Sequence, residues 1–341
     1  MANDYDNDGD QDLFVGGRVL PQAYPKSPES MLLINRGGRF TKQTKELASG
    51  LENVGMVTSA IWSDYDKDGD EDLIVAGEWM PISIWENDGK KLVAKEVNSL
   101  QHTAGWWSSL SANDLDGDGD DDYIVGNIGL NHKFKASKDK PFHVYCEDFD
   151  NTGSLDIVLA FHQEDKLYPV RGRDCSSEQM PFILDKFPSF EDFGNADVDD
   201  IYGDKLDKAL HKEVNMFSSV ILMNEGGRFK IMELPAEAQL SAVNGSVVAD
   251  FTGDSIKDIL LAGNMFETEA ETSRADASIG LLLKGQHDGT YHPVNVKESG
   301  FFAPGDVKDI KMIGLNDGSK AILVANNNGP LQVFKTNSLL Q

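Results

Sequence analysis

The stretch "DYDKDGDED", residues 64–72, places an aspartate at every second position around a single glycine. Close copies occur at residues 4–12 ("DYDNDGDQD") and 114–122 ("DLDGDGDDD"). Looser copies occur at residues 148–156 ("DFDNTGSLD") and 250–258 ("DFTGDSIKD"). Self-similarity of this kind is the signature of a repeat architecture, so it decides the fold before any other feature.

Short apolar runs flank the acidic stretches. "TSAIWS" (58–63) precedes the second copy and "DLIVAGEW" (72–79) follows it. Runs rich in β-branched and apolar residues that end at glycine or a polar residue are typical of buried strands. Glycines also separate pairs of strand-like runs, as in "MLLINRGGRF" (31–40) and "VILMNEGGRF" (220–229), which indicates hairpin turns.

Each unit therefore consists of a strand, an acidic loop, a strand, a link, a strand, a glycine turn and a strand. Four antiparallel strands repeated around an axis make a β-propeller. Six units are recognisable, the last of them (309–334) without an acidic loop. We expect an all-β protein, a β-propeller of six or seven four-stranded blades, with residues 1–341 as a single propeller domain. The strand that should precede the first acidic loop is missing, so we expect the chain to be a fragment of a longer protein.

The repeat is irregular in its middle part. Only 34 residues separate the starts of the third and fourth acidic stretches, so that unit is shortened or shares strands. A surplus follows, and we expect residues 168–214 to form an insertion. Its later part, 197–214, has a helical spacing of Ile201, Leu206 and Leu210, which predicts a short helix.

Alternate carboxylates in a tight loop can converge on one hard cation. Positions one, three, five and nine would supply carboxylates, and position seven its backbone carbonyl. Calcium suits such a site better than magnesium because it accepts about 6–8 oxygens at flexible geometry. The loops hold no Cys/His cluster, which makes zinc and copper poor candidates. The alternative is a set of solvated acidic turns without a metal.

We expect three strong calcium sites and two weaker ones. Thr152 replaces a carboxylate in the fourth loop, and in the fifth Thr252 does so while Ser255 replaces the turn glycine. Fewer charges mean weaker binding. The strong candidate positions are Asp4, Asp6, Asp8, Asp10, Asp12, Asp64, Asp66, Asp68, Asp70, Asp72, Asp114, Asp116, Asp118, Asp120 and Asp122. The weaker ones are Asp148, Asp150, Thr152, Ser154, Asp156, Asp250, Thr252, Asp254, Ile256 and Asp258.

The helix-flanked EF-hand is the motif most easily confused with these loops. It needs a glutamate at position twelve and a helix on each side. Position twelve is occupied here by Val15, Val75, Val125, Leu159 and Leu261, all apolar. The sequence therefore excludes an EF-hand.

The formal net charge of -26 argues against nucleic acid and anionic membrane as partners, since both require a basic face. No apolar run reaches the roughly 18 residues of a membrane span. No signal peptide is visible in this fragment. Cys146 and Cys175 either pair or remain two separate thiols.

In this β context the acidic loops resemble the FG-GAP or VCBS repeats of integrin-α-type propellers, over nearly the whole chain. The runs "GWWSSLSANDLDGDGDDDYIVGNIGLN", "YPVRGRDC" and "AVNGSVVADFTGD" are similar to large FG-GAP/VCBS repeat surface proteins of Bacteroidetes-type bacteria, related to the cartilage acidic protein family. The resemblance implies calcium-braced blades, a secreted, periplasmic or cell-surface location, and partner binding. It implies no particular ligand.

Because the acidic loops join the first and second strand of each unit, we expect them on one face of the ring and a partner-binding surface on the other. Aromatic rings beside amide and guanidinium groups suit a glycan or a protein. Adjacent tryptophans in a strand point to opposite sides, so one of the two in this set belongs to the core. The candidates are Trp106, Trp107, Asn127, Asn131, Arg171, Arg173, Asp174, Asn244 and Asn264.

The expected function is non-catalytic recognition or adhesion. No nucleophile elbow, zinc-protease motif or phosphate loop is present. One alternative is a lyase-like polysaccharide-processing enzyme with a calcium-braced propeller, in which Arg171 or His162 would serve. Another is a scaffold module of a surface complex.

Overall fold

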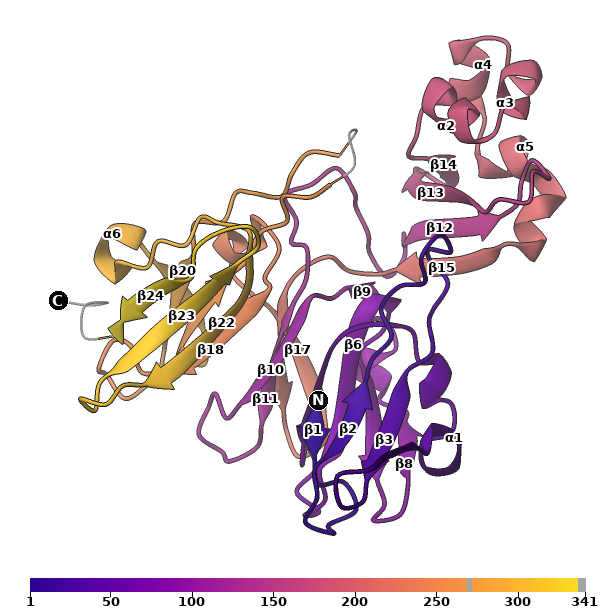
Figure 1. Cartoon of the computed structure of the whole chain (residues 1–341). Helices are drawn as coiled ribbons and strands as arrows, with labels where there is room; N and C mark the ends of the chain where they lie inside the picture. Colours follow the sequence, from indigo (N-terminus) through magenta and orange to yellow (C-terminus); the bar gives the residue numbers. More distant parts are fainter. Residues whose placement is uncertain (269–271, 337–341) are drawn as a thin grey trace.

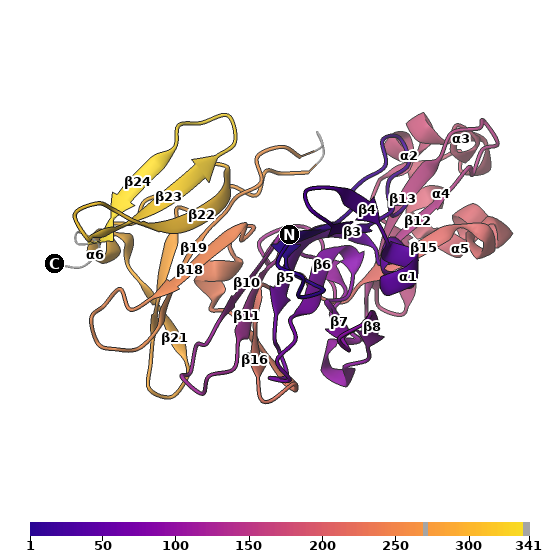
Figure 2. The same ribbon diagram turned by 60° about the horizontal axis from the view of Figure 1, so that its bottom comes forward.

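The structure, a computed structural model, describes residues 1–268 and 272–336. Within these residues the chain forms six antiparallel sheets and several short helices. Five sheets follow one another in an arc, while the sixth stands apart together with most of the helices (Figure 1, Figure 2). The all-β, propeller-like fold predicted from the repeats is confirmed.

The five sheets of the arc are numbered here along the chain. Sheet 1 contains β1 (Ala2–Asn3), β2 (Asp12–Val15), β3 (Met31–Asn35) and β4 (Phe40–Lys42). Sheet 2 contains β5 (Met56–Ser63), β6 (Asp72–Met80), β7 (Ser83–Asn87) and β8 (Leu92–Lys95), with β9 (Gly105–Trp106) added to β6. Sheet 3 contains β10 (Ser109–Asn113), β11 (Asp122–Gly126), β16 (Val220–Asn224) and β17 (Phe229–Glu233). Sheet 4 contains β18 (Gly245–Ala249), β19 (Asp258–Ala262), β20 (Leu281–Gly285) and β21 (Tyr291–Val294). Sheet 5 contains β22 (Val307–Gly314), β23 (Lys320–Asn326) and β24 (Gln332–Lys335).

The first strands of neighbouring sheets lie side by side. β5 contacts β10, β10 contacts β18, and β18 contacts β22. The apolar faces of adjacent sheets pack on each other; Phe14 and Ile34 of sheet 1, for example, share one core cluster with Leu73 and Val75 of sheet 2. Each sheet thus buries its faces against its neighbours in the manner of propeller blades.

Sheet 3 is interrupted by a separate unit. Between β11 and β16 the chain forms an inserted sheet with strand order β14-β13-β12-β15. Its strands are β12 (Phe142–Glu147), β13 (Asp156–Gln163), β14 (Lys166–Pro169) and β15 (Leu210–Val214). The third and fourth acidic stretches are close in sequence because the later strands of sheet 3 follow the inserted unit.

The segment 168–214 supplies the helical part of the inserted unit. Its helices are α2 (Arg173–Gln179), α3 (Phe182–Lys186), α4 (Phe190–Asn195), α5 (Val198–Tyr202) and the 3-10 helix η3 (Gly203–Lys208). They pack on one face of the inserted sheet, where Val158 and Ala160 meet Ile183, Phe193 and Ile201.

The single helix predicted over residues 197–214 is only partly correct. α5 and η3 occupy its first part, but Leu210 begins β15. β15 pairs with the edge of β12, so residues with helical spacing form a strand in this structure. Tertiary pairing has overridden a local pattern here.

The remaining helices are single turns between strands. They are α1 (Thr44–Leu47), η1 (Leu51–Asn53), η2 (Asn98–Leu100), η4 (Ala236–Gln239) and α6 (Val296–Ser299). Across residues 1–268 and 272–336, no helix has the length and apolar character to cross a membrane. No disulfide joins Cys146 to Cys175.

Candidate metal centres and a pocket at the opposite end of the sheets

Each acidic loop folds around the carboxylate of its first aspartate. In the third loop Asp114 accepts hydrogen bonds from the backbone N–H groups of Gly117 at 2.7 Å and Gly119 at 3.2 Å. In the fourth, Asp148 accepts from Thr152 at 2.9 Å and Gly153 at 2.8 Å. Charge-assisted bonds of this kind are stronger than neutral ones and hold the loop around the carboxylate.

The wrapped loop needs left-handed backbone at its fourth and sixth positions. In the second loop these are Lys67, with φ of 59°, and Gly69, with φ of 98°. Four of the five loops place glycine at the sixth position, but the fifth has Ser255 there, with φ of 70°. A side chain in this region of backbone space is strained.

We expect Ser255→Gly to raise the free energy of unfolding by about 1 kcal/mol, because glycine relieves the left-handed strain. Chemical denaturation in calcium buffer measures the change. Ser154→Gly is the matched control: Ser154 lies in the fourth loop outside the set of positive-φ residues, so glycine there should not stabilise. Equal effects of the two substitutions would contradict the explanation.

The ninth-position aspartate of every loop is buried. These residues are Asp12, Asp72, Asp122, Asp156 and Asp258. In sheet 3, Asp122 accepts from the backbone N–H of Leu115 in the loop at 2.9 Å and from that of Asn224 on the third strand at 2.8 Å. The side chain therefore fastens the acidic loop to the hairpin that follows, a role not predicted from the sequence.

The fifth and seventh positions also bond within this framework. Asp118 accepts from the backbone of Asp120 at 2.8 Å. The carboxylate of Asp120 turns to the hairpin glycine Gly226, accepting at 2.9 Å, and Asp10 does the same with Gly37 at 2.6 Å. In the first and third loops the seventh-position side chain is thus engaged by the glycine turn.

Carboxylates converge in four of the loops. Their oxygens lie within 4.8 Å of one another in the groups Asp4/Asp6/Asp8, Asp64/Asp66/Asp72, Asp114/Asp116/Asp122 and Asp148/Asp150/Asp156. Within the described residues the fifth loop forms no such group. Asp254 there pairs with Lys284 at 2.9 Å, whereas the fourth loop, also predicted to be a weaker site, does form such a group.

The second loop shows best that a cation fits. Buried oxygens of Asp64, Asp66 and Asp72 lack a hydrogen bond of normal geometry among the described residues, although the backbone N–H groups of Asp68 and Tyr65 lie close to Asp66 and Asp72. Burial raises the pKa of Asp72 to about 7, with the charges of Asp66 and Asp68 adding to the effect. Converging buried oxygens with few donors are costly unless a positive charge joins them, and an all-oxygen set suits calcium.

The acidic loops of sheets 2 and 3 are also joined to each other. Asn224 of sheet 3 donates from Nδ2 to the backbone carbonyl of Tyr65 in the second loop at 2.7 Å. Lys67 of the second loop forms an ion pair with Asp120 of the third. The two loops are therefore linked by one hydrogen bond and one ion pair.

The acidic loops do not all lie on one face, contrary to the prediction. Four of them connect first and second strands in sheets 1 to 4 and share one end of the arc. The fourth loop connects β12 to β13 in the inserted sheet, which stands apart from the arc (Figure 1). The short spacing before this loop predicted an irregular unit, but not that the repeat lies outside the row.

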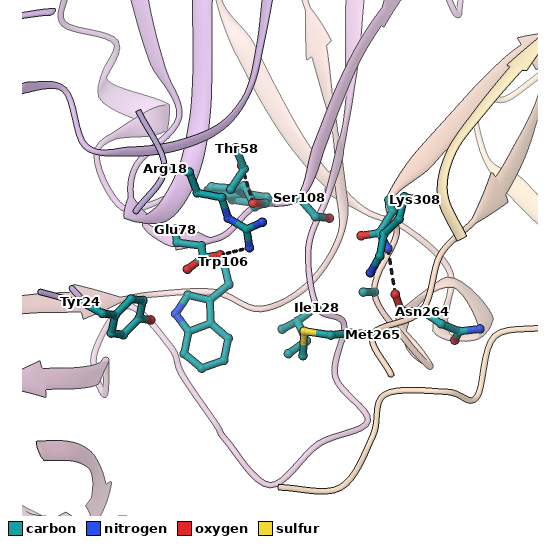
Figure 3. A pocket seen from close by; sticks show the side chains of 13 residues that line it. Arg18, Tyr24, Thr58, Glu78, Trp106, Ser108, Ile128, Asn264, Met265 and Lys308 are labelled. Atoms are coloured by element: carbon teal, nitrogen blue, oxygen red, sulfur yellow. Dashed lines mark hydrogen bonds and ion pairs between the residues drawn. The ribbon is translucent and has the colours of Figure 1, made fainter. Parts of the chain in front are cut away.

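A pocket of about 410 Å³ lies at the other end of the strands. The acidic loops precede the second strands, whereas the pocket is formed by residues at or beyond the ends of those strands, such as Glu78 and Asn264 (Figure 3). Its lining residues are Arg18, Tyr24, Thr58, Glu78, Trp106, Trp107, Ser108, Ile128, Ala242, Asn244, Asn264, Met265 and Lys308.

The pocket combines aromatic, apolar and charged groups. Figure 3 shows Tyr24 and Trp106 towards one side and Lys308 towards the other. Arg18 and Glu78 form an ion pair at 2.6 Å, and Lys308 pairs with Asp306 at 2.8 Å. The setting offers both charged donors and a flat apolar surface to a ligand.

Trp106 is held by other aromatic rings. Its ring centroid lies 5.2 Å from that of Phe217, 5.3 Å from that of Trp79 and 5.4 Å from that of Phe134. Its indole Nε1 is buried and has no acceptor among the described residues. Trp107, by contrast, is 1% exposed and donates to the carbonyl of Thr103, so the prediction that one of the two tryptophans belongs to the core is confirmed.

Three predicted asparagines form structural hydrogen bonds; Asn244 and Asn264 line the pocket, and the buried Asn127 is outside its lining. Asn264 donates from Nδ2 to the carbonyls of Ser278 and Gly305, both at 2.9 Å. Asn244 donates to the carbonyl of Asn264 at 2.9 Å. Asn127 lies beneath Trp106, accepting from its backbone N–H at 3.3 Å. These side chains shape the pocket by fixing the loops around it.

The other predicted partner-binding residues lie outside this pocket. Asn131 lines a neighbouring cavity of about 230 Å³ that shares Trp106. Arg173 lies in α2, where it donates to the carbonyl of Phe187 at 2.7 Å and pairs with Asp174 at 3.2 Å. Arg171 immediately precedes α2. This segment continues into the helices of the inserted unit, which holds it away from the ends of the inner strands (Figure 1).

Sequence reasoning missed the charged residues of the pocket. Arg18, Glu78 and Asn264 each stand six residues after the ninth-position aspartate of their unit. Aligning the units on that aspartate would have placed Arg18 and Glu78 beside the predicted Asn264. Lys308 carries no comparable signal because its unit lacks the acidic loop.

Part of the chain matches a known family of sequence repeats. Residues 4–75 and 64–125 each match the FG-GAP-like repeat, so the chain carries this repeat at least twice. No curated protein matches the chain.

Solved structures resemble the chain only distantly. A crystal structure of BBS1N in complex with ARL6DN, soaked with lead, is 12% identical, with a TM-score of 0.34, over 100% of this chain and 79% of that one. The crystal structure of the V. cholerae biofilm matrix protein Bap1 is 13% identical, with a TM-score of 0.31, over 97% of this chain and 51% of that one.

Proposed function

We propose that this chain, which carries FG-GAP-like repeats, is a calcium-braced recognition module that binds a glycan or protein partner outside the cytoplasm. The observation that carries the calcium part is the set of buried oxygens of Asp64, Asp66 and Asp72 that lack a hydrogen bond of normal geometry among the described residues. Extracellular modules bind calcium at about 10⁻⁴–10⁻³ M, a range that is met outside cells and not in cytosol. The closer relationship to large bacterial surface proteins and the cartilage acidic protein family is part of this proposal.

The partner would occupy the 410 Å³ pocket. Trp106 supplies part of the aromatic lining of the pocket, and aromatic rings suit sugars and peptides. Arg18 and Lys308 supply cationic donors within an otherwise strongly acidic protein. A polar partner that carries acidic groups fits this set best.

Arg18→Ala and Lys308→Ala should each weaken partner binding about tenfold, since a hydrogen bond to a charged group contributes about 1.5–3 kcal/mol. A glycan array and a panel of extracellular proteins, screened in calcium, identify the partner, and titration calorimetry measures its affinity. Lys311→Ala is the matched control because Lys311 lies on the same strand, β22, but outside the pocket lining.

Unchanged affinity in both pocket variants would contradict the assignment of the pocket. The same panel should include acidic polysaccharides, with the products checked for new unsaturated ends. Cleavage would favour the lyase-like alternative over recognition. Capture of a large envelope complex without any glycan or single-protein ligand would favour the scaffold alternative.

A further inference from the structure

A cluster of histidine side chains lies on the inserted sheet. Its potential metal ligands are mainly imidazole nitrogens, whereas those of the acidic loops are carboxylate oxygens. His143 on β12 is directly opposite Glu213 on β15, and Tyr145 is opposite His211. Residues opposite each other or two apart in neighbouring antiparallel strands point to the same face, so His143, His211 and Glu213 share one face. His162 on β13 joins them, since its neighbour two residues back, Ala160, is opposite His143.

The donor atoms of three of these side chains converge. His143 Nδ1 lies 2.9 Å from His211 Nε2 and 3.6 Å from Glu213 Oε1, and His211 Nε2 lies 3.8 Å from Glu213 Oε1. A tetrahedral zinc ion, about 2.0–2.1 Å from each ligand, sets its ligands roughly 3.3–3.4 Å apart. The three separations fall on either side of that value, and metal binding requires the 2.9 Å contact between His143 Nδ1 and His211 Nε2, a hydrogen bond in this structure, to open.

The surroundings of the cluster hold two of the rings in place. His211 stacks on Tyr145, with ring centroids 4.4 Å apart and planes 4° from parallel. The second nitrogen of His143, Nε2, lies 3.1 Å from His162 Nε2. In the tautomer in which His143 Nε2–H donates to His162, the Nδ1 lone pair is directed at His211 and Glu213, as in metal sites whose histidines are oriented by an outer partner.

The cluster is closed on one side and open on the other. The side chain of His143 is 8% exposed, whereas that of Glu213 is 44% exposed. A metal ion can therefore enter from the Glu213 side, and a water molecule can complete its coordination.

We propose that His143 Nδ1, His211 Nε2 and Glu213 bind a divalent transition-metal ion such as zinc, and that His162 positions His143. The site is distinct from the calcium loops because imidazole selects zinc, copper or nickel, while all-carboxylate sets select calcium. It has three protein ligands and a solvent-facing fourth position. The proposal is independent of the recognition function.

Cobalt and zinc alone are suitable probes. Protein without a histidine tag, stripped of metals and then saturated with calcium to fill the acidic loops, is titrated with Co²⁺ and then with Zn²⁺. We expect a visible absorption band of low-coordinate cobalt that zinc abolishes, and one tight zinc site by calorimetry. His211→Ala and Glu213→Gln should weaken zinc binding more than tenfold, and His162→Ala should weaken it about 10–100-fold, as for other outer-sphere partners.

His292→Ala is the matched control, since His292 is an exposed histidine on β21 of sheet 4, and it should leave zinc affinity unchanged. Glu213→Gln alters a half-exposed side chain at nearly constant shape, so it remains informative if an alanine variant fails to fold. Absence of a tight zinc site in the wild-type protein would overturn the proposal and leave the imidazoles as a hydrogen-bonded chain. Undiminished binding in both His211→Ala and Glu213→Gln would overturn it equally.

Discussion

Removal of calcium is expected to lower the melting temperature of this protein by about 10 °C. Calcium at 10 to 100 times its dissociation constant stabilises the folded state by about 1.4–2.7 kcal/mol per site, because only the folded loops bind it. The three strong loops together then contribute roughly 4–8 kcal/mol. In a chain of this length each kcal/mol corresponds to roughly 2 °C.

Thermal unfolding followed by circular dichroism, with EDTA and then with excess calcium, measures this shift. Magnesium at the same concentration should restore little of the stability, because it retains its waters and demands octahedral geometry. Coincident melting curves in EDTA and calcium would show that the acidic loops are solvated turns.

Asp72→Ala is expected to reduce the free energy of unfolding in calcium by about 3–5 kcal/mol. The substitution removes a fully buried carboxylate that accepts from the backbone N–H of Asn87 at 2.7 Å and belongs to the second candidate site. The substitution leaves that N–H without its acceptor. It also removes one of the carboxylates that would bind a cation at this site. Denaturant unfolding at saturating calcium gives the value.

Glu71→Ala is the control, because it removes the same charge from the adjacent, exposed position of the same loop. It should change the free energy of unfolding by less than about 0.5 kcal/mol. If the two variants were equally stable, the ninth-position aspartate would be an ordinary surface charge and not the fastener described here. A further expectation is that the deficit of Asp72→Ala shrinks in EDTA, since part of it depends on the bound cation.

The repeat units could be predicted from the sequence because their signals are local. Alternating aspartates, glycine at the sixth position and a buried strand beginning at the ninth all lie within a few residues of one another. The burial of one of the two adjacent tryptophans was likewise expected, although only Trp106 lies in β9 and it is Trp107 that is buried. Each of these features depends on the local backbone conformation, which the few residues of the loop and its flanking strand determine.

Features that depend on distant pairing could not be predicted in this way. The hairpin of residues 220–229 was recognised, but nothing in it indicates that its partner is β11. The charged residues of the pocket come from separate units, and the imidazole cluster unites three strands of the inserted sheet. In each case the information lies in which strands become neighbours, and a single sequence does not show that directly.

The interruption of sheet 3 has a consequence for how the chain folds. β10 and β11 are made early, but the strand that covers the open edge of β11 begins only at Val220. During synthesis that edge stays unpaired until the whole inserted unit has emerged, and long-range strand pairing is intrinsically slow. Sheet 3 is therefore the last of the first three sheets to close, and its exposed edge is the point at which a newly made chain is most open to misassembly.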